Sequence, residues 1–263
     1  MELKCLLVGV SAAIAGAAAQ YAYSTYLWPN RHKTYNWIYA LRNHRKCGEP
    51  CQTDKVLDRD GYSLGYSYQY KSALWVSYII STGSIGVDVD RSDEFYADPD
   101  IPKKYRIEPN DFVNTGYDRG HLAPSAAIDF SRLSNKQTFA MSNIALQDPK
   151  LNRQAWGSLE RTIRGWTSNK GKLYIITGPL YDENPKRIND IPVPKSFYKI
   201  VYAFSDKKAI GFIIPNEPIK ASQLWDYAVS VQEVEKQTGY HFFDKLGNKV
   251  SKADLNKSWW KNK

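Results

Sequence analysis

Residues 117–124 read Tyr-Asp-Arg-Gly-His-Leu-Ala-Pro, a stretch whose composition is typical of a functional site. It places the imidazole of His121 close to the guanidinium of Arg119 and the carboxylate of Asp118, and Pro124 prevents a helix from continuing through it. Short motifs also recur by chance, so a hydrogen-bonded core histidine beside an ordinary surface ion pair is the alternative interpretation. The sequence that follows decides between the two.

Residues 151–164 carry the helical period, because apolar side chains recur at steps of three and four positions. Asn152 lies in the first turn of this predicted helix. Glu160 follows eight positions later, about 80° further around the axis and roughly 12 Å along it. The two side chains therefore cannot ligate one ion with equal directness. Helical side chains lean toward the N-terminus, so Glu160 can reach back and bond water on an ion that Asn152 holds.

These stretches together resemble the sugar-non-specific DNA/RNA endonucleases, whose active site is a ββα-metal, or His-Me, finger. The resemblance extends from about residue 60 to about residue 243. It rests on several ordered motifs, which are Asp118-Arg119-Gly120-His121, Ser142-Asn143-Ile144, Leu151-Asn152-Arg153 with Trp156 and Leu159-Glu160, Thr177-Gly178-Pro179, Val193-Pro194-Lys195, Tyr198-Lys199, Phe212-Ile213-Ile214-Pro215-Asn216, and Arg91 with Phe95 and Asp98-Pro99. One position departs, since Leu146 precedes Gln147 where the family commonly has proline.

The resemblance implies hydrolysis of phosphodiester bonds in both DNA and RNA, single or double stranded. Neutral His121 is suited to accept a proton from the attacking water. Mg²⁺ keeps several waters and needs few protein ligands, so Asn152 is a sensible sole anchor, with Mn²⁺ or Ca²⁺ as alternative ions. Glu160 is expected to orient the water around the ion.

Further side chains are expected to hold the substrate. Arg164 lies one turn beyond Glu160 and is predicted to grip the phosphate together with Arg119 or Arg91. The resemblance also implies that Asn143 is a substrate-binding or supporting residue, although its position equally suits an ordinary turn. No zinc finger, RNP motif or helix-turn-helix is present, so recognition through phosphates and groove shape is expected.

The distribution of apolar and β-branched residues predicts an α+β fold. Strands are expected at residues 65–70, 74–80, 143–146, 172–177, 198–204 and 209–214, and short helices at residues 135–140 and between Ser230 and Thr238. Ser230 and Glu233 resemble a capping box, and Gly171 and Gly239 are expected to end the Asn152 helix and the Ser230 helix. Few helices and non-alternating order indicate a largely antiparallel central sheet flanked by helices. The resemblance implies the same architecture, with the His121 strand and the Asn152 helix forming the finger.

The charge balance favours a polyanionic partner. The chain of 263 residues has 36 Lys and Arg against 27 Asp and Glu, which gives a formal charge of +9. Cations that neutralise phosphates release counterions on binding, so nucleic acid is the expected partner. A generic basic surface, and binding to membrane lipid or cell-wall polyanions, are the alternatives that charge alone leaves open.

The N-terminal segment resembles a secretory leader. An apolar run from Leu6 to Ala19 ends in three alanines, which suits cleavage before Gln20. Aromatic residues continue the run as far as Trp28, so an uncleaved membrane anchor is the alternative. The sequence therefore predicts a periplasmic or secreted protein. The run lacks the Arg-rich amphipathic character of a mitochondrial presequence.

Two cysteines remain once the leader, which contains Cys5, is set aside. Cys47 and Cys51 lie four positions apart, and in an exported chain they are expected to form a local disulfide. A zinc site that adds His44 to this pair is the rival interpretation, although a fourth ligand has no obvious candidate.

Four segments are expected along the chain: the leader (1–19), an N-terminal extension with the disulfide (20–60), the nuclease domain (61–244) and a basic tail (245–263) that is solvated or touches nucleic acid weakly. No protein partner is evident, and the oligomeric state is not predicted. Two other functions stay open at this point. One is a catalytically silent nucleic-acid-binding protein on the same fold, and the other is an exported phosphodiesterase that acts on small nucleotides.

Overall fold

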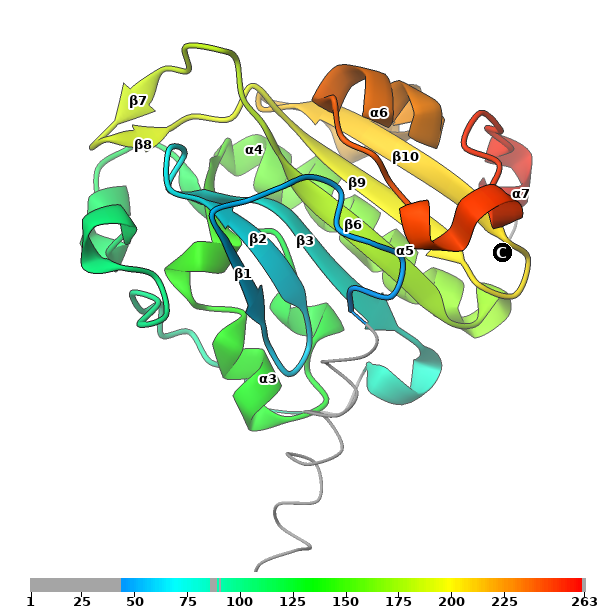
Figure 1. Ribbon diagram of the computed structural model, residues 1–263, viewed down its shortest axis with the longest axis horizontal. Coiled ribbons are helices and arrows are strands. Elements are labelled where there is room, and N and C mark those ends of the chain that lie inside the picture. The colour runs from blue at the N-terminus through cyan, green and yellow to red at the C-terminus, as the bar shows by residue number, and fades with distance from the viewer. Residues whose placement is uncertain (1–43, 86–88, 90, 262–263) are drawn as a thin grey trace, which may run out of the picture.

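A seven-stranded antiparallel sheet forms the centre of the protein (Figure 1). The computed structural model describes residues 44–85, 89 and 91–261. The order of strands across the sheet is β1 (Lys55–Asp58), β2 (Ser63–Ser67), β3 (Ser72–Ile80), β6 (Leu173–Leu180), β9 (Ser196–Ala203), β10 (Lys208–Pro215) and β11 (Ala228–Val229), and each neighbouring pair is antiparallel. The predicted α+β class with a largely antiparallel sheet is confirmed.

Both faces of this sheet are buried. Successive side chains of a strand point to opposite faces, so in β9 Phe197 and Val201 enter one core cluster and Tyr198 and Ile200 the other. A strand covered on both sides needs apolar residues at nearly every position. This requirement explains the almost continuous apolar sequence of β6, β9 and β10.

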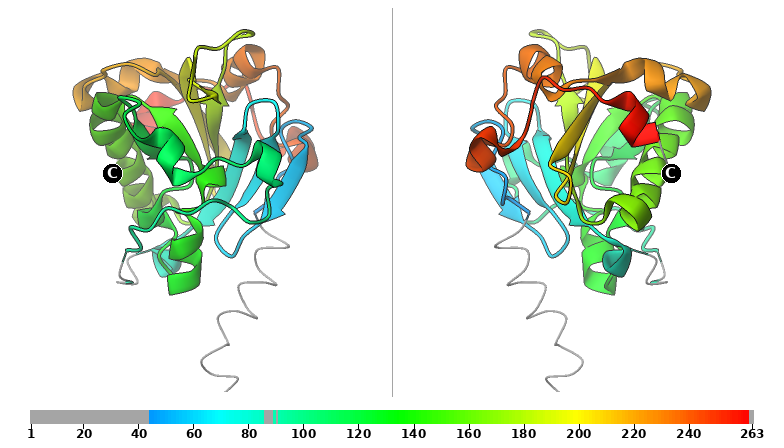
Figure 2. Two further views of the ribbon diagram at one scale, coloured as in Figure 1. Left: turned by 90° about the vertical axis from the view of Figure 1, so that its left-hand side faces the viewer. Right: turned by 90° about the vertical axis from the view of Figure 1, so that its right-hand side faces the viewer.

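Helices lie on both faces of the sheet (Figure 2). Helix α5 (Gly157–Lys170) packs on one side through Leu159 and Ile163, and helix α6 (Val231–Thr238) packs on the other through Val231 and Val234. The ends of both helices match the prediction. Gly171, at φ 68°, follows the last residue of α5, and Gly239, at φ 72°, ends α6 in the left-handed region.

A separate two-stranded sheet leads into α5. Strand β4 (Asp118–His121) pairs antiparallel with β5 (Ile144–Gln147), and the short helix α3 (Arg132–Gln137) lies between them in the sequence. After β5 come one helical turn, α4 (Pro149–Leu151), a π-helical turn (Asn152–Trp156) and then α5. Two strands followed by a helix form the ββα unit that the sequence predicts. A small hairpin of β7 (Arg187–Ile188) and β8 (Ile191–Pro192) lies apart from both sheets.

The ends of the described chain are more integrated than the sequence suggested. Strand β1 lies in the expected N-terminal extension, yet it pairs with β2 at the edge of the central sheet. The basic C-terminal segment contains helix α7 (Lys257–Lys261), whose Trp260 is fully buried in the core. It is therefore not simply a solvated tail, because Trp260 supplies an apolar anchor that a count of lysines does not reveal.

The predicted leader, with its cleavage site before Gln20, lies outside the described residues. Among the residues that are described, no helix combines the length and apolar character needed to cross a membrane.

The two cysteines are free thiols, so the predicted disulfide is absent from the structure. Cys47 is buried, and burial raises the pKa of its thiol to about 12 and that of Cys51 to about 11, which keeps both protonated. His44 Nε2 lies 3.3 Å from the backbone oxygen of Asp60. Across the described part of the chain, no three His, Cys, Asp or Glu side chains are grouped to hold a metal ion, so the zinc alternative lacks a ligand set.

Candidate active site

The β4–β5 pair fixes the position of His121. His121 lies opposite Ile144 in the register of the two strands. Gly120, the preceding residue, packs so tightly against Gln147 that a Cβ atom there would lie 2.5 Å from Gln147 Oε1. Glycine is therefore required at this position because the neighbouring side chain occupies the space. Packing thus accounts for Gly120, while the side chains of Asp118, Arg119 and His121 remain available for chemistry.

The start of the following helix is fixed independently by two side chains. Asp148 caps it, because Oδ1 accepts hydrogen bonds from the backbone N–H groups of Lys150 (2.8 Å) and Leu151 (3.0 Å). Asn216, at the end of β10, accepts from the backbone N–H of Asp148 at 2.7 Å and donates to the carbonyl of Leu146 at 3.0 Å. These contacts tie the helix start to both the finger and the central sheet.

Asn152 occupies the π-helical turn with its amide held in one orientation. Its Nδ2 donates to Asp118 Oδ2 at 3.0 Å, which leaves Oδ1 as the acceptor on the other side of the amide. Arg153 grips the same carboxylate through Nε (2.9 Å) and a terminal nitrogen (2.7 Å). Burial alone would raise the pKa of Asp118, but the Arg153 and Asn152 contacts hold it below its usual value. Asp118 is thus an ionised residue that positions Asn152.

The imidazole of His121 lies against two aromatic rings. Its centroid is 5.5 Å from that of Phe95 and 4.9 Å from that of Phe139. Nε2 is buried and has no hydrogen-bond partner among the described residues. Burial, helped by the positive charge of Arg91 and opposed by Asp93, lowers the pKa of His121 to about 3. The ring is therefore neutral across the physiological range and can accept a proton.

Glu160 faces a buried cation. Lys199 Nζ lies 3.8 Å from Glu160 Oε1, its side chain is 0% exposed, and Nζ lies 4.4 Å from the centroid of the Trp156 ring. Burial raises the pKa of Glu160, while Lys199 and Arg164 oppose that rise. Burial likewise lowers the pKa of Lys199 to about 8, and the Glu160 charge acts against it. Each charge thus favours ionisation of the other in a site that disfavours both.

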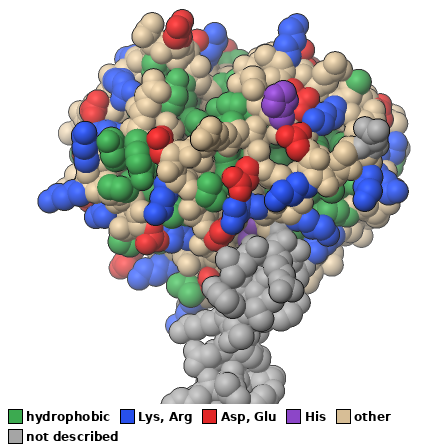
Figure 3. Space-filling model, in the orientation of Figure 1, with side chains coloured by type: hydrophobic (Ala, Val, Ile, Leu, Met, Phe, Trp, Pro, Cys, Tyr) green, Lys and Arg blue, Asp and Glu red, His purple; other side chains and the backbone are tan. Residues whose placement is uncertain are grey.

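One cavity of about 350 Å³ collects the predicted functional side chains. Six of the seven are on its wall: Arg91, Arg119, His121, Asn152, Glu160 and Arg164. Arg153 and Arg161 join them, so the wall carries five arginines and a single acidic residue, Glu160. The α6 side of the molecule differs, because basic and acidic side chains are interspersed over it (Figure 3). Such a concentration of positive charge in one cavity suits a phosphate diester.

Asn143 is the exception, and its prediction as a substrate-binding residue needs correction. The side chain is 0% exposed. Its Oδ1 accepts from the backbone N–H of Ala123 at 2.9 Å, and its Nδ2 donates to the carbonyls of Ala123 (2.9 Å) and Thr138 (2.8 Å). Asn143 therefore clamps the chain that leaves His121, which is a supporting role.

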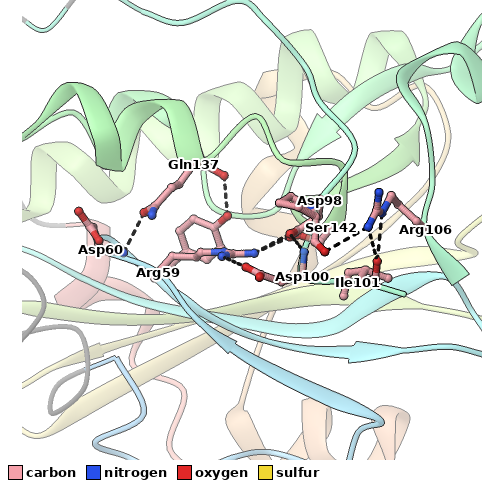
Figure 4. Close-up of polar contacts among 10 residues, drawn as sticks. Arg59, Asp60, Asp98, Asp100, Ile101, Arg106, Gln137 and Ser142 are labelled. Atoms are coloured by element: carbon pink, nitrogen blue, oxygen red, sulfur yellow. Dashed lines mark hydrogen bonds and ion pairs between the residues drawn. The ribbon is translucent and has the colours of Figure 1, made fainter. Parts of the chain in front are cut away.

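The loop that carries Arg91 and Phe95 is anchored by a buried carboxylate (Figure 4). Asp98 is 1% exposed, and both of its oxygens accept from one nitrogen of Arg59, at 2.7 and 2.6 Å. The Ser142 hydroxyl also donates to Asp98. Since Ser142 directly precedes Asn143 and β5, the Asp98 and Ser142 motifs of the sequence meet here and join the loop to the finger. A larger cavity beside this network, about 730 Å³, lacks His121, Asn152 and Glu160 on its wall.

Sequence reasoning missed three contributors to the site. These are Asp118, Phe139 and Lys199, none of which has a role predicted from the sequence. Lys199 did carry a signal, because it occupies a core-facing position between Phe197 and Val201 in an apolar strand. A lysine at such a position is rarely buried without a charged partner. Its partner could not be found, because the contact joins segments far apart in the sequence.

Comparison with known proteins agrees with this geometry. The profile of the DNA/RNA non-specific endonuclease family matches residues 43–249. A nuclease of Syncephalastrum racemosum is 36% identical over 237 residues, which cover 80% of this chain and 73% of that protein. The mitochondrial nuclease of Saccharomyces cerevisiae is 31% identical, with 79% of this chain and 71% of that protein covered. Mitochondrial endonuclease G of Bos taurus is 30% identical, with 72% and 69% covered.

A solved structure shares the fold. The crystal structure of the EndoG/EndoGI complex, in which EndoG is inhibited, superimposes with a TM-score of 0.72 at 27% sequence identity. The similarity covers 78% of this chain and 92% of that chain. The central sheet and the ββα unit are therefore features that this chain shares with an experimentally determined nuclease.

Proposed function

The chain belongs to the DNA/RNA non-specific endonuclease family and is an endonuclease, and we propose that it cuts DNA and RNA at the cavity around His121 with the help of one divalent metal ion. The observation that carries the proposal is the meeting of a neutral imidazole, a fixed amide oxygen and five arginines on one cavity wall. The roles of the individual residues follow from their contacts.

His121 is proposed as the general base. Only a neutral imidazole can take a proton from the attacking water, and burial keeps His121 neutral at pH 7. Phe95 and Phe139 hold the ring and limit its freedom to turn. Nε2 is buried among protein atoms, so we assign the other ring nitrogen, Nδ1, to the water.

The arginines are proposed to hold the phosphate. Arg119 is steadied by a hydrogen bond from its terminal nitrogen to the carbonyl of Pro109 at 2.9 Å, and its guanidinium lies 5.1 Å from the centroid of Phe95. Arg91 lies over Phe139 in the same way, at 5.3 Å. Arg164 and Arg161 enter from α5 on the other side. Charge-assisted hydrogen bonds from both sides would fix the diester and stabilise negative charge as it develops.

Asn152 and Glu160 are proposed to hold the metal. Asn152 Oδ1 is a hard, neutral oxygen whose direction is set by the bond from Nδ2 to Asp118, and Glu160 supplies a carboxylate for water on the ion. Oxygen donors of this kind fit Mg²⁺, and Mn²⁺ or Ca²⁺ would use the same set. When bound, the ion would supply positive charge beside the phosphate and acidify water for the leaving oxygen. Lys199 is proposed to keep Glu160 ionised for this task.

We propose that the protein recognises nucleic acid through contacts with phosphate and sugar and not through contacts with base edges. Arginines and lysines that contact phosphates position a protein on nucleic acid but read no sequence. The cavity wall offers five such cations. This matches the absence of a sequence-reading motif and the family's action on DNA and RNA.

Export is a separate proposal that rests on the leader alone. The apolar run before Gln20 supports it, while the Saccharomyces and Bos relatives carry the word mitochondrial in their names. Mass spectrometry of the protein from its native compartment tests both this and the cysteine pair. A chain that begins at Gln20 with Cys47 and Cys51 oxidised would support export, and two free thiols would rule out the disulfide.

The mechanism is tested by purified wild type against purified His121→Ala, in Mg²⁺, on plasmid, on RNA and on a small phosphate bis-ester. The variant should lose at least about 10²- to 10⁴-fold in rate, the usual contribution of positioned proton transfer, while it still binds DNA through the arginines. Cutting of either polymer by the variant at a near wild-type rate would exclude His121 as the base. Wild type that turns over only the small ester would instead point to a phosphodiesterase.

A further inference from the structure

A second cavity, lined by tryptophans, opens on the far half of α5. Its volume is about 570 Å³, within the usual range of small-molecule sites. Trp166 and Gly165 of α5, Trp225 from the segment after β10, and Trp260 and Lys261 of α7 form its wall. Both views in Figure 2 show the end of the chain lying beside α5. None of the side chains assigned to catalysis belongs to this cavity.

The aromatic rings of this cavity are tilted rather than stacked on one another. Trp166 lies 4.7 Å from Trp260 and 6.2 Å from Trp225 between ring centroids, with interplanar angles of 51° and 53°. Trp225 is only half-buried. Trp166 and Trp260 are buried, so Trp225 is the ring with an accessible face for a flat ligand.

A cation stands at the edge of the same cavity. Lys261 is exposed, and its Nζ lies 5.0 Å from the centroid of the Trp225 ring. Aromatic rings beside a lysine are the combination with which proteins hold single-stranded nucleic acid, because every base has a π-face and every linkage a negative charge. A purely apolar ligand would use the rings but gain nothing from Lys261.

Helix α5 connects this cavity to the catalytic one. Arg161 and Arg164 line the catalytic cavity, and Gly165, next to Arg164 in sequence and one turn beyond Arg161, lines the tryptophan cavity. From Glu160 to Asn169, another residue of the wall, α5 rises by roughly 14 Å. A strand covers that distance in about four nucleotides at duplex spacing, and in fewer when it is extended.

Gly165 supports a close approach of ligand to this part of α5. It is exposed in the middle of the helix, where glycine is among the least favourable residues. A Cβ atom built on Gly165 would meet nothing within 4 Å, so no packing in the described structure demands glycine there. A bare backbone at this point would instead leave room for a substrate that passes from one cavity to the other.

We propose that the tryptophan cavity is a second nucleotide-binding subsite, which takes one unpaired base of the strand whose phosphate lies at His121, with Lys261 beside an adjoining phosphate. The inference rests on the proposed function, because it uses the same bound strand. It predicts that oligonucleotides long enough to reach both cavities bind more tightly than those that fill only the first.

The test uses Gly165→Leu, which fills the mouth of the cavity while it replaces glycine by a better helix former. Binding of fluorescein-labelled dT3 and dT8 is measured by polarisation in a His121→Ala background, which prevents cleavage. We expect Gly165→Leu to unfold at a higher temperature yet to bind dT8 about 5- to 150-fold more weakly, the effect of one lost base stack, with dT3 affected by less than twofold. Gly165→Ala is the matched control, because it adds one methyl group without filling the cavity.

Two further measurements, tryptophan fluorescence and the salt dependence of affinity, complete the experiment. dT8 should quench tryptophan fluorescence, and Lys261→Gln should lower the slope of log affinity against log salt by about one. Equal loss of dT3 and dT8 binding, no loss of either, or quenching by a small apolar probe but not by dT8 would each overturn the subsite. These outcomes are independent of the mechanism at His121, which fails only if His121→Ala still cuts nucleic acid.

Discussion

The two helices that cover the central sheet are built in different ways. In α6 the Ser230 hydroxyl accepts from the backbone N–H of Glu233 at 3.2 Å, Val231 and Val234 fill the core, and Gly239 closes the helix. The helix that ends in α5 is interrupted near its start by a π turn at Asn152–Trp156 and packs against the charged Lys199. The α6 side of the sheet therefore has a regular, capped helix over an apolar core, whereas the α5 side has an irregular helix over a buried charge.

The difference shows where the protein accepts a thermodynamic cost. Three buried polar atoms without a hydrogen-bond partner, His121 Nε2, Arg119 Nε and Lys199 Nζ, lie within or behind the catalytic cavity, and others, such as His44 Nδ1 and Thr53 Oγ1, lie elsewhere in the described structure. A buried polar atom that lacks a partner costs about 1–3 kcal/mol. Such a cost persists where it serves a function, and for Lys199 the function that we propose is to keep Glu160 ionised.

The largest effect is expected at the π turn. Asn152→Ala removes the proposed metal anchor, so cleavage at ordinary Mg²⁺ should fall by more than about 100-fold, beyond what changes behind a ligand usually cost. Thermal unfolding should change little, because Asn152 is not a core residue. Gln154→Ala is the matched control in the same turn, since Gln154 is exposed and absent from the cavity wall. Unaltered Mg²⁺ dependence in Asn152→Ala, or full activity of wild type in EDTA, would refute the anchor.

An intermediate effect is expected for the buried ion pair. Glu160→Gln should lose about 10- to 100-fold in rate. Lys199→Met should also lose activity, because without the cation burial raises the pKa of Glu160 further and less of it is ionised; the loss should grow as pH falls from 8 to 6. Lys199→Met leaves the buried Glu160 carboxylate without its counter-ion, which typically costs about 3–5 kcal/mol, so the unfolding temperature of this variant should fall and its rate should be measured well below that temperature.

The double variant makes this pair testable as a unit. If Lys199 acts only through Glu160, Glu160→Gln with Lys199→Met should be no slower than Glu160→Gln alone. Multiplied losses in the double variant would mean that Lys199 acts on the reaction by another route.

The smallest effect is expected on the α6 side. Ser230→Ala removes the cap of α6 and should destabilise the protein by about 1 kcal/mol, seen as a drop of a few degrees in unfolding temperature. Its cleavage rate at 25 °C should equal that of wild type, because α6 and the catalytic cavity lie on opposite sides of the sheet. A rate that falls together with stability would show that the two sides are not independent.

The same contrast explains which features the sequence could predict. The cap and end of α6, the end of α5 and the strands of the sheet follow from local patterns, and those predictions are confirmed. Co-location of His121, Asn152, Glu160 and the arginines followed from motif resemblance, because no local rule brings residues 91, 121 and 160 together.

Other features depend on contacts between distant segments. The sequence left open whether Asn143 binds substrate or supports the site, because burial, which turns an amide into a clamp for Ala123 and Thr138, has no local signature. The pKa of His121 lies far below the ordinary value of about 6.5, because burial among Phe95 and Phe139 with Arg91 nearby lowers it to about 3, and no local pattern in the sequence indicates that burial. The π turn at Asn152 was likewise missed, since its residues show the usual helical period.

The central claim is that burial holds His121 neutral so that it can act as the base. The most direct measurement compares the single-turnover cleavage rates of purified wild type and His121→Ala on one plasmid in Mg²⁺ at pH 7 and at pH 5. Taking the ratio at each pH removes effects of pH on the rest of the site. Because a depressed pKa leaves the imidazole unprotonated at both values, the ratio should be about 10²- to 10⁴-fold at pH 7 and of the same size at pH 5. A ratio that collapses toward one at pH 5 would contradict the buried neutral imidazole, and a ratio near one at both would contradict the base itself.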